Sequence, residues 1–278
     1  MNKTIILLIA LALIASSCGQ SGTKKQAVNI ETYCVEDTST TVNNTDFVEV
    51  ESEIEEQNMS DSQLFDIQEI DSVKYFAAKG KTATSKTKWE KITDLEQAKK
   101  MLKGRVIWGE YDNETYKFVE DEQGEIVSKM HFRNGKTYLY EHPEAFFIAY
   151  YPQEDILLLE GEHTTDVSFN LTTGEETENV GNPEYIIFSP SKQYRLNGHF
   201  NGQECSSWFI QKKIDGCYQK IIQIDSQREY EKSEFEKRAR IWFCDIVDVF
   251  WQDDTTLNFV TPIVDGKEIK LYYQLTLK

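Results

Sequence analysis

Several motifs that carry common enzyme chemistry are missing from this 278-residue chain. It has no Gly-x-Ser-x-Gly elbow, no phosphate-binding loop and no dinucleotide fingerprint. No CxxC pair is present, so neither a redox motif nor a zinc ribbon is indicated. The histidines show no metal-ligand spacing such as HxxxH, and we expect each on the surface or in a turn: His131, His142, His163 and His199. The sequence predicts no cofactor and no metal site, and it leaves any catalytic residues unknown.

Positive charge is also scarce. The chain has 30 Lys and Arg against 47 Asp and Glu, a formal net charge of -17. Such an acidic protein repels nucleic acid, and we exclude a nucleic-acid partner on this ground. We interpret the acidity as a source of solubility, in preference to an acidic face that binds a ligand.

Apolar runs long enough to span a bilayer, which takes about 20 residues, are missing too. Near its N-terminus the chain has one positive charge, Lys3, followed by a short apolar run at residues 5–14. Small residues stand at 15–17, and Cys18 comes next. A positive start, a short apolar core and a small-residue cleavage site are typical of a secretory signal peptide. The alternative is a plain cleaved signal, in which the cysteine is incidental.

The cysteine directly after Ala15-Ser16-Ser17 resembles the lipobox of bacterial lipoproteins. Ala15 departs from that pattern, because the family usually has leucine there. The resemblance implies that residues 1–17 are removed and that Cys18 is acylated, which anchors the chain to a membrane. Residue 19 is Gly and not Asp, and in the best-known sorting rule for bacterial lipoproteins this favours the outer membrane. The stretch after Cys18 lacks an acidic surface-export run, so we expect the periplasmic face, with the cell surface as the alternative.

Residues 18–88 are predicted to be a disordered tether. Polar residues dominate, and the stretch 46–71 has many acids but no Lys or Arg. Lysines then follow in quick succession at 74, 79, 81, 86, 88 and 91. The basic stretch could attract the acidic one, contact an anionic partner or remain solvated. Residues 19–72 have the composition of a linker, and a flexible chain of about 54 residues reaches roughly 40 Å.

A short helix is predicted near residues 94–103. Thr93-x-x-Glu96 is a capping-box pattern, and Gly104 is placed as a C-terminal stop. The apolar residues at 95, 98, 101 and 102 fall on one face at helical spacing.

From residue 105 the chain reads as short strands and tight turns, with Asn134-Gly135 as the strongest hairpin signal. The phrase of apolar strand, polar turn and second strand recurs at residues 146–159, 185–196 and 246–260. We predict an all-β domain of mainly antiparallel meanders over 89–278, either propeller-like or a sandwich, with a helical insertion near 226–240.

Two phrases, Thr173-Gly174-Glu175 and Phe188-Ser189-Pro190, resemble WD40-like β-propeller repeats of bacterial envelope proteins. The resemblance covers residues 145–225 well, 245–278 loosely, and 105–141 by strand pattern only. No Trp-Asp dipeptide marks a blade. The resemblance implies about four strands per unit.

Cysteines are candidates for a disulfide, and tryptophans are candidates for ligand binding. An oxidising compartment allows a disulfide among Cys205, Cys217 and Cys244, whereas buried thiols are the alternative. Trp108, Trp208 and Trp251 fall on predicted strands. They are candidate ligand-binding aromatics if exposed, or core residues if buried.

The sequence therefore leads us to expect a membrane-anchored envelope lipoprotein without enzymatic activity. Its β domain would bind an envelope protein, a peptide or a glycan. The alternative is an envelope hydrolase that acts on carbohydrate through paired carboxylates, one of which would need a raised pKa.

Overall fold

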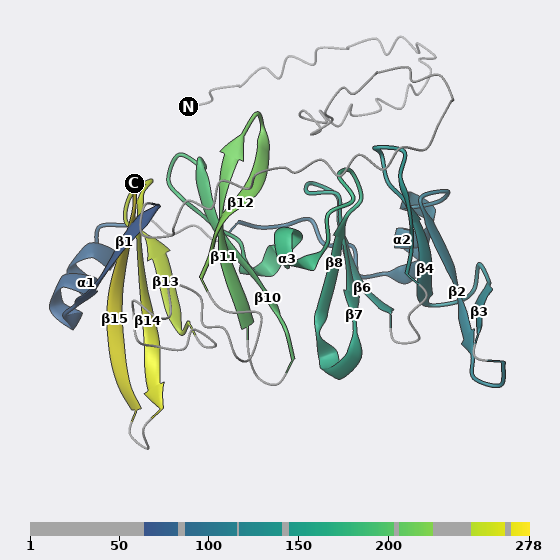
Figure 1. Cartoon of the computed structure of the whole chain (residues 1–278), viewed down its shortest axis with the longest axis horizontal. Coiled ribbons are helices and arrows are strands. Elements are labelled where there is room, and N and C mark those ends of the chain that lie inside the picture. Colours follow the sequence, from purple (N-terminus) through teal and green to yellow (C-terminus); the bar gives the residue numbers. More distant parts are fainter. Residues whose placement is uncertain are drawn as a thin grey trace, which may run out of the picture. The chain divides into compact units, whose positions relative to one another are not determined.

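The structure is a computed structural model that describes residues 64–82, 87–115, 117–140, 145–202, 206–224, 246–264 and 268–278. These residues form three antiparallel sheets with short helices, which confirms the predicted all-β class (Figure 1). The insertion predicted near 226–240 lies outside the described residues. Within them, no helix combines the length and apolar character that a membrane crossing requires.

The largest sheet has seven strands in the order β3-β2-β4-β6-β7-β8, and β5 pairs with β4. Their bounds are β2 (Val106–Asp112), β3 (Lys117–Glu120), β4 (Ile126–His131), β5 (Thr137–Leu139), β6 (Phe146–Tyr151), β7 (Ile156–Glu160) and β8 (Asp166–Asn170). One face of β6–β8 carries Tyr150, Leu157 and Phe169 into a core that also contains Ala98 of helix α2 (Leu95–Met101) and Leu102, the C-cap of that helix. Alternation along each strand produces this face.

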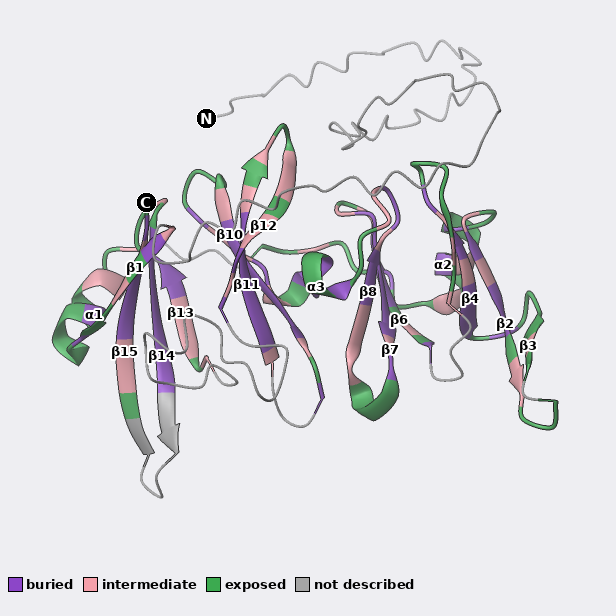
Figure 2. Cartoon of the chain, in the orientation of Figure 1, coloured by how far each residue is buried: buried purple, intermediate pink, exposed green. Residues whose placement is uncertain are grey.

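The second sheet is a meander of β9 (Ile187–Phe188), β10 (Tyr194–Phe200), β11 (Ser206–Ile214) and β12 (Cys217–Gln223). The third contains β13 (Asp248–Trp251), β14 (Thr256–Val264), β15 (Glu268–Leu277) and β1 (Phe65–Ile70). Leu196 and Ile210 of the second sheet share one core with Trp251 and Phe259 of the third. The buried residues run along the strands of all three sheets (Figure 2).

The recurring phrase of the sequence corresponds to three hairpins: β6–β7, β9–β10 and β13–β14. Two of their turns touch, because the backbone N–H of Ser191 donates to Asp254 Oδ1 over 2.7 Å. The regions 105–141 and 145–180 do not form separate sheets. They share the seven-stranded sheet through the pair Ile126–Phe146 of β4 and β6.

Part of the predicted tether has regular structure. Strand β1 and helix α1 (Ser72–Lys79) lie within residues 18–88. Strand β1 is an edge strand, and among its residues only Phe65 and Ile70 are buried. Its partner is β15, about two hundred residues away along the chain, and local composition cannot reveal such a pairing.

Helix α2 occurs where it was predicted, but its cap differs. Asp94, and not Thr93, is the N-cap, and its side chain accepts a hydrogen bond from the backbone N–H of Gln97. Gly104 lies just beyond the helix with a φ of 78°, a conformation that favours glycine. The other helices in the described part of the chain are α3 (Thr177–Val180) and two 3-10 turns, η2 (Glu162–Thr164) and η3 (Pro183–Tyr185).

Candidate functional site

The three candidate tryptophans belong to the core. Trp108 is packed with the core of the seven-stranded sheet, and Trp208 and Trp251 with the core shared by the other two sheets. Each is at most 8% exposed. None of the three therefore offers a ring face on which a sugar could stack.

The candidate cysteines are only partly described. Cys217, at the start of β12, is disulfide-bonded. Cys205 and Cys244 lie outside the described residues, as does Cys18.

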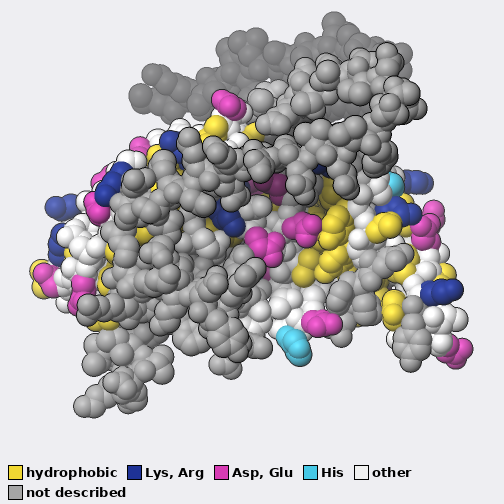
Figure 3. Space-filling view, viewed as in Figure 1, with side chains coloured by type: hydrophobic (Ala, Val, Ile, Leu, Met, Phe, Trp, Pro, Cys, Tyr) yellow, Lys and Arg dark blue, Asp and Glu magenta, His cyan; other side chains and the backbone are white. Residues whose placement is uncertain are grey.

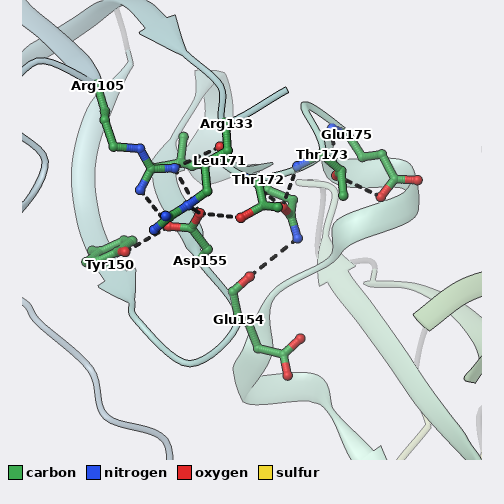
Figure 4. Close-up of polar contacts among 10 residues, drawn as sticks. Arg105, Arg133, Tyr150, Glu154, Asp155, Leu171, Thr172, Thr173 and Glu175 are labelled. Atoms are coloured by element: carbon green, nitrogen blue, oxygen red, sulfur yellow. Dashed lines mark hydrogen bonds and ion pairs between the residues drawn. The ribbon is translucent and has the colours of Figure 1, made fainter. Parts of the chain in front are cut away.

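A buried carboxylate lies at the centre of a hydrogen-bond cluster at one end of the seven-stranded sheet. Asp155, in the β6–β7 turn, is 3% exposed. Arg105 donates two hydrogen bonds to it, of 2.9 and 2.8 Å, and Arg133 donates one of 3.0 Å. Tyr150 and Thr172 complete the set with hydroxyl groups at 2.8 and 2.6 Å. Figure 4 shows these side chains converging on Asp155 from separate strands and turns.

This cluster stabilises the fold. Burial alone would raise the pKa of Asp155, but the hydrogen bonds from Arg105 and Thr172 outweigh burial and hold that pKa below its ordinary value. Arg105 also donates to the carbonyl oxygen of Leu171 over 2.8 Å. The cluster therefore joins the start of β2 to the turns after β6 and β8.

The neighbouring acid, Glu154, binds an arginine of the second sheet. Its side chain points away from Asp155 (Figure 4) and accepts a hydrogen bond of 2.8 Å from Arg195 of β10. Arg195 is buried, donates to Gln211 of β11 over 2.6 Å, and lies 4.0 Å above the ring of Tyr218. Two adjacent acids in one turn therefore bind arginines in two different sheets.

A polar layer continues from Arg195 along the second sheet. Asn197 and Gln211 donate to the carbonyl oxygens of Val180 and Asn179, at the end of α3, over 2.7 and 2.6 Å. Asp166 of β8 accepts hydrogen bonds from Asn182 and from the backbone N–H of Phe200. The seven-stranded sheet therefore meets the second sheet mainly through polar groups.

Three atoms near this layer are buried and, among the described residues, have no hydrogen-bond partner. They are His199 Nδ1, Ser207 Oγ and Ser168 Oγ. His199 and Ser207 lie opposite each other on β10 and β11. The prediction that every histidine is on the surface or in a turn is wrong for His199, which is 6% exposed. Burial lowers its pKa, whereas Glu178 and Asp166 act in the opposite direction.

The face of β6 that meets this layer ends in exposed apolar residues. Ala149 and Tyr151 are buried against Val180 of α3, whereas Phe146 and Ile148 are 43% and 36% exposed. A register shift between Phe147 and Ala149 marks Ile148 as a bulge, which redirects its side chain. Figure 3 shows hydrophobic side chains gathered over the β6–β8 region, next to acidic ones. We call Phe146 and Ile148 the β6 patch.

We searched the described ranges for metal-binding groups and for carboxyl groups with a raised pKa. They contain no group of three or more His, Cys, Asp or Glu side chains that could hold a metal ion. The described carboxyl groups with a resolved pKa shift all shift downward: Asp112, Asp155 and Asp254. A general acid of a glycosidase needs the opposite shift.

Comparison with protein-family models, curated proteins and solved structures finds no match.

Sequence reasoning missed Asp155, Arg195 and the β6 patch. Acids in a polar turn are ordinarily solvated, and nothing local to Glu154-Asp155 indicates that both are bound by distant arginines. Phe146 and Ile148 stand in a strand that is apolar throughout, so the sequence does not reveal which of its residues are exposed. Only part of β6 is buried, because the short helix α3 covers only that part of the strand.

Proposed function

We propose that this chain is an envelope lipoprotein, anchored through Cys18 to the outer membrane and facing the periplasm, whose β domain binds a protein or peptide. The β6 patch carries the proposal. Phe146 lies opposite the acidic Glu160 of β7, and exposed large apolar side chains are typical of protein-interaction surfaces. A peptide with apolar and basic residues would match that chemistry.

The interior polar groups support binding over catalysis. Asp155, Glu154 and Arg195 are the conspicuous buried or half-buried charges, and each is engaged within the fold. The buried tryptophans favour a protein or peptide over a glycan, because sugar recognition commonly uses exposed aromatic faces.

The test compares the mature chain, residues 18–278 with Cys18→Ser, with its Phe146→Ser/Ile148→Ser variant. Both are immobilised and exposed to detergent-solubilised envelope proteins, and the retained proteins are identified by mass spectrometry. We expect a saturable partner for the first chain and roughly tenfold weaker retention by the variant, since loss of two apolar anchors weakens an interface by that order or more.

Val247→Ser is the matched control, because Val247 is also exposed, at 53%, but precedes β13. Equal retention by the wild-type chain and the β6-patch variant would refute this surface as the binding site. The anchor is tested separately by the mass of the protein purified from membranes. A mature N-terminus without acyl chains would contradict lipidation at Cys18.

A further inference from the structure

Helix α1 exposes an apolar and basic face. Val73 and Phe76 are 77% and 57% exposed, and at a spacing of three residues they lie on the same side of the helix. Lys74 and Lys81 are exposed in the same segment. Residues 72–82 contain three lysines and no acid, in a chain whose net charge is -17. Large apolar side chains with lysines are typical of helices that lie at a membrane surface.

This face is presented by a firmly held helix. Tyr75 is fully buried between Phe250 and Tyr272, with ring centroids 5.2 and 5.0 Å away. Its hydroxyl group donates to Asp248 Oδ2 over 2.9 Å, and Lys79 forms an ion pair with the same carboxylate. The ring of Phe76 also contacts Tyr272 edge-on, with centroids 5.9 Å apart. Val73 and the exposed part of Phe76 are therefore presented on a fixed support, which reduces the entropy lost on binding.

The acids near α1 are mostly engaged. Asp71 caps the helix by accepting a hydrogen bond from the backbone N–H of Lys74. Asp248 is paired with Lys79, and Asp66 with Lys278 at 3.1 Å. Among the described residues before the helix, Glu69 of β1 is the exposed acid that remains. The basic character of the α1 face is therefore largely preserved.

We propose that the α1 face, defined as Val73, Lys74, Phe76 and Lys81, rests on an anionic lipid surface. The inference rests on the lipid attachment in the proposed function. In the described ranges β1 and α1 are the elements closest to Cys18 along the chain. A tether keeps a weak site at an effective concentration in the millimolar range, so modest affinity suffices. Anionic headgroups repel the acidic remainder of the chain and attract the lysines, which orients α1 toward the membrane.

The experiment uses the unlipidated mature chain, residues 18–278 with Cys18→Ser, and two kinds of vesicle. One contains phosphatidylglycerol and phosphatidylethanolamine, and the other contains phosphatidylcholine alone. In cosedimentation at low salt we expect binding to the anionic vesicles, with roughly tenfold loss for Val73→Ser/Phe76→Ser and for Lys74→Glu/Lys81→Glu. Met101→Ser is the control, because Met101 is an exposed apolar residue of α2, at 46%, and should leave binding unchanged.

Three outcomes would overturn the proposal. They are no binding of the wild-type chain to anionic vesicles, equal binding of the wild-type chain and the α1 variants, and self-association through Val73 and Phe76 in place of vesicle binding. A Phe76→Trp variant checks the contact directly, since its fluorescence should shift to the blue when anionic vesicles are added. These outcomes are independent of partner capture through the β6 patch, so either proposal can fail alone.

Discussion

Single residues with buried charge connect the sheets of this protein. Asp155 receives hydrogen bonds from two arginines and two hydroxyl groups, and Arg195 is bound by Glu154 and Gln211. A buried ion pair contributes little net stability over an apolar substitute, but removal of one partner leaves a buried charge without compensation. These residues therefore specify which strands and turns meet.

Asp155→Asn tests this role. We expect it to lower the free energy of unfolding by about 3–5 kcal/mol, measured by urea denaturation, because Arg105 and Arg133 lose their common acceptor. Since the pKa of Asp155 is lower in the folded chain than in the unfolded one, its stabilisation is present above pH ~4 and is lost as the pH falls through the folded-state pKa. The variant should lack that part of the acid sensitivity. Glu110→Gln, at an exposed position of β2, is the control, and an equal loss there would contradict the role of Asp155.

At the scale of elements, short strands and turns could be predicted well, because alternation and turn residues act within a few positions. The strand, turn and second strand predicted at 146–159 match β6 and β7. Tyr185 begins a predicted strand but lies in η3, where Pro183 at the first helical position favours a turn. Strand β1 and helix α1 were missed because their stability depends on β13 and β15, far away in the sequence.

The cap of α2 illustrates how local patterns compete. Thr93-x-x-Glu96 and Asp94 both offer a cap, and the structure uses Asp94. We expect Asp94→Ala to lower the free energy of unfolding by about 1 kcal/mol, as for a typical N-cap, and Thr93→Ala to have a much smaller effect. Paired urea titrations of the two variants measure the difference. A larger effect of Thr93→Ala would show that the capping box is the stronger determinant.

At the scale of the whole molecule, the candidate site was less predictable than the fold. The β6 patch, the Asp155 cluster and the α1 face all depend on contacts between segments far apart in the chain, such as α3 with β6 and α1 with β15. The sequence pattern of short strands and tight turns correctly indicated a β-rich chain. It could not indicate which apolar side chains remain uncovered, because cover is supplied by distant elements.

A chain that starts at residue 88 tests the importance of β1 and α1 for the whole domain. It would lack Phe65 and Tyr75, both fully buried, and each such loss from a core typically costs about 3–5 kcal/mol. The sum approaches the total stability of a typical domain, ~5–15 kcal/mol. We expect this chain to be largely insoluble or to melt well below a chain that starts at residue 64. Equal soluble yield and melting temperature would show that β1 and α1 are dispensable.

The pairing of β1 with β15 also determines how the domain carries mechanical load. The backbone N–H of Lys278 donates to the carbonyl oxygen of Leu64 over 2.9 Å, and the first ladder pair is Phe65 with Leu277. If a bound partner holds the domain while the membrane moves, tension in the proposed tether acts first on this pair. Leu64 and Lys278 thus lie side by side, and the strand that ends at Leu277 shares the force that the proposed lipid anchor would transmit.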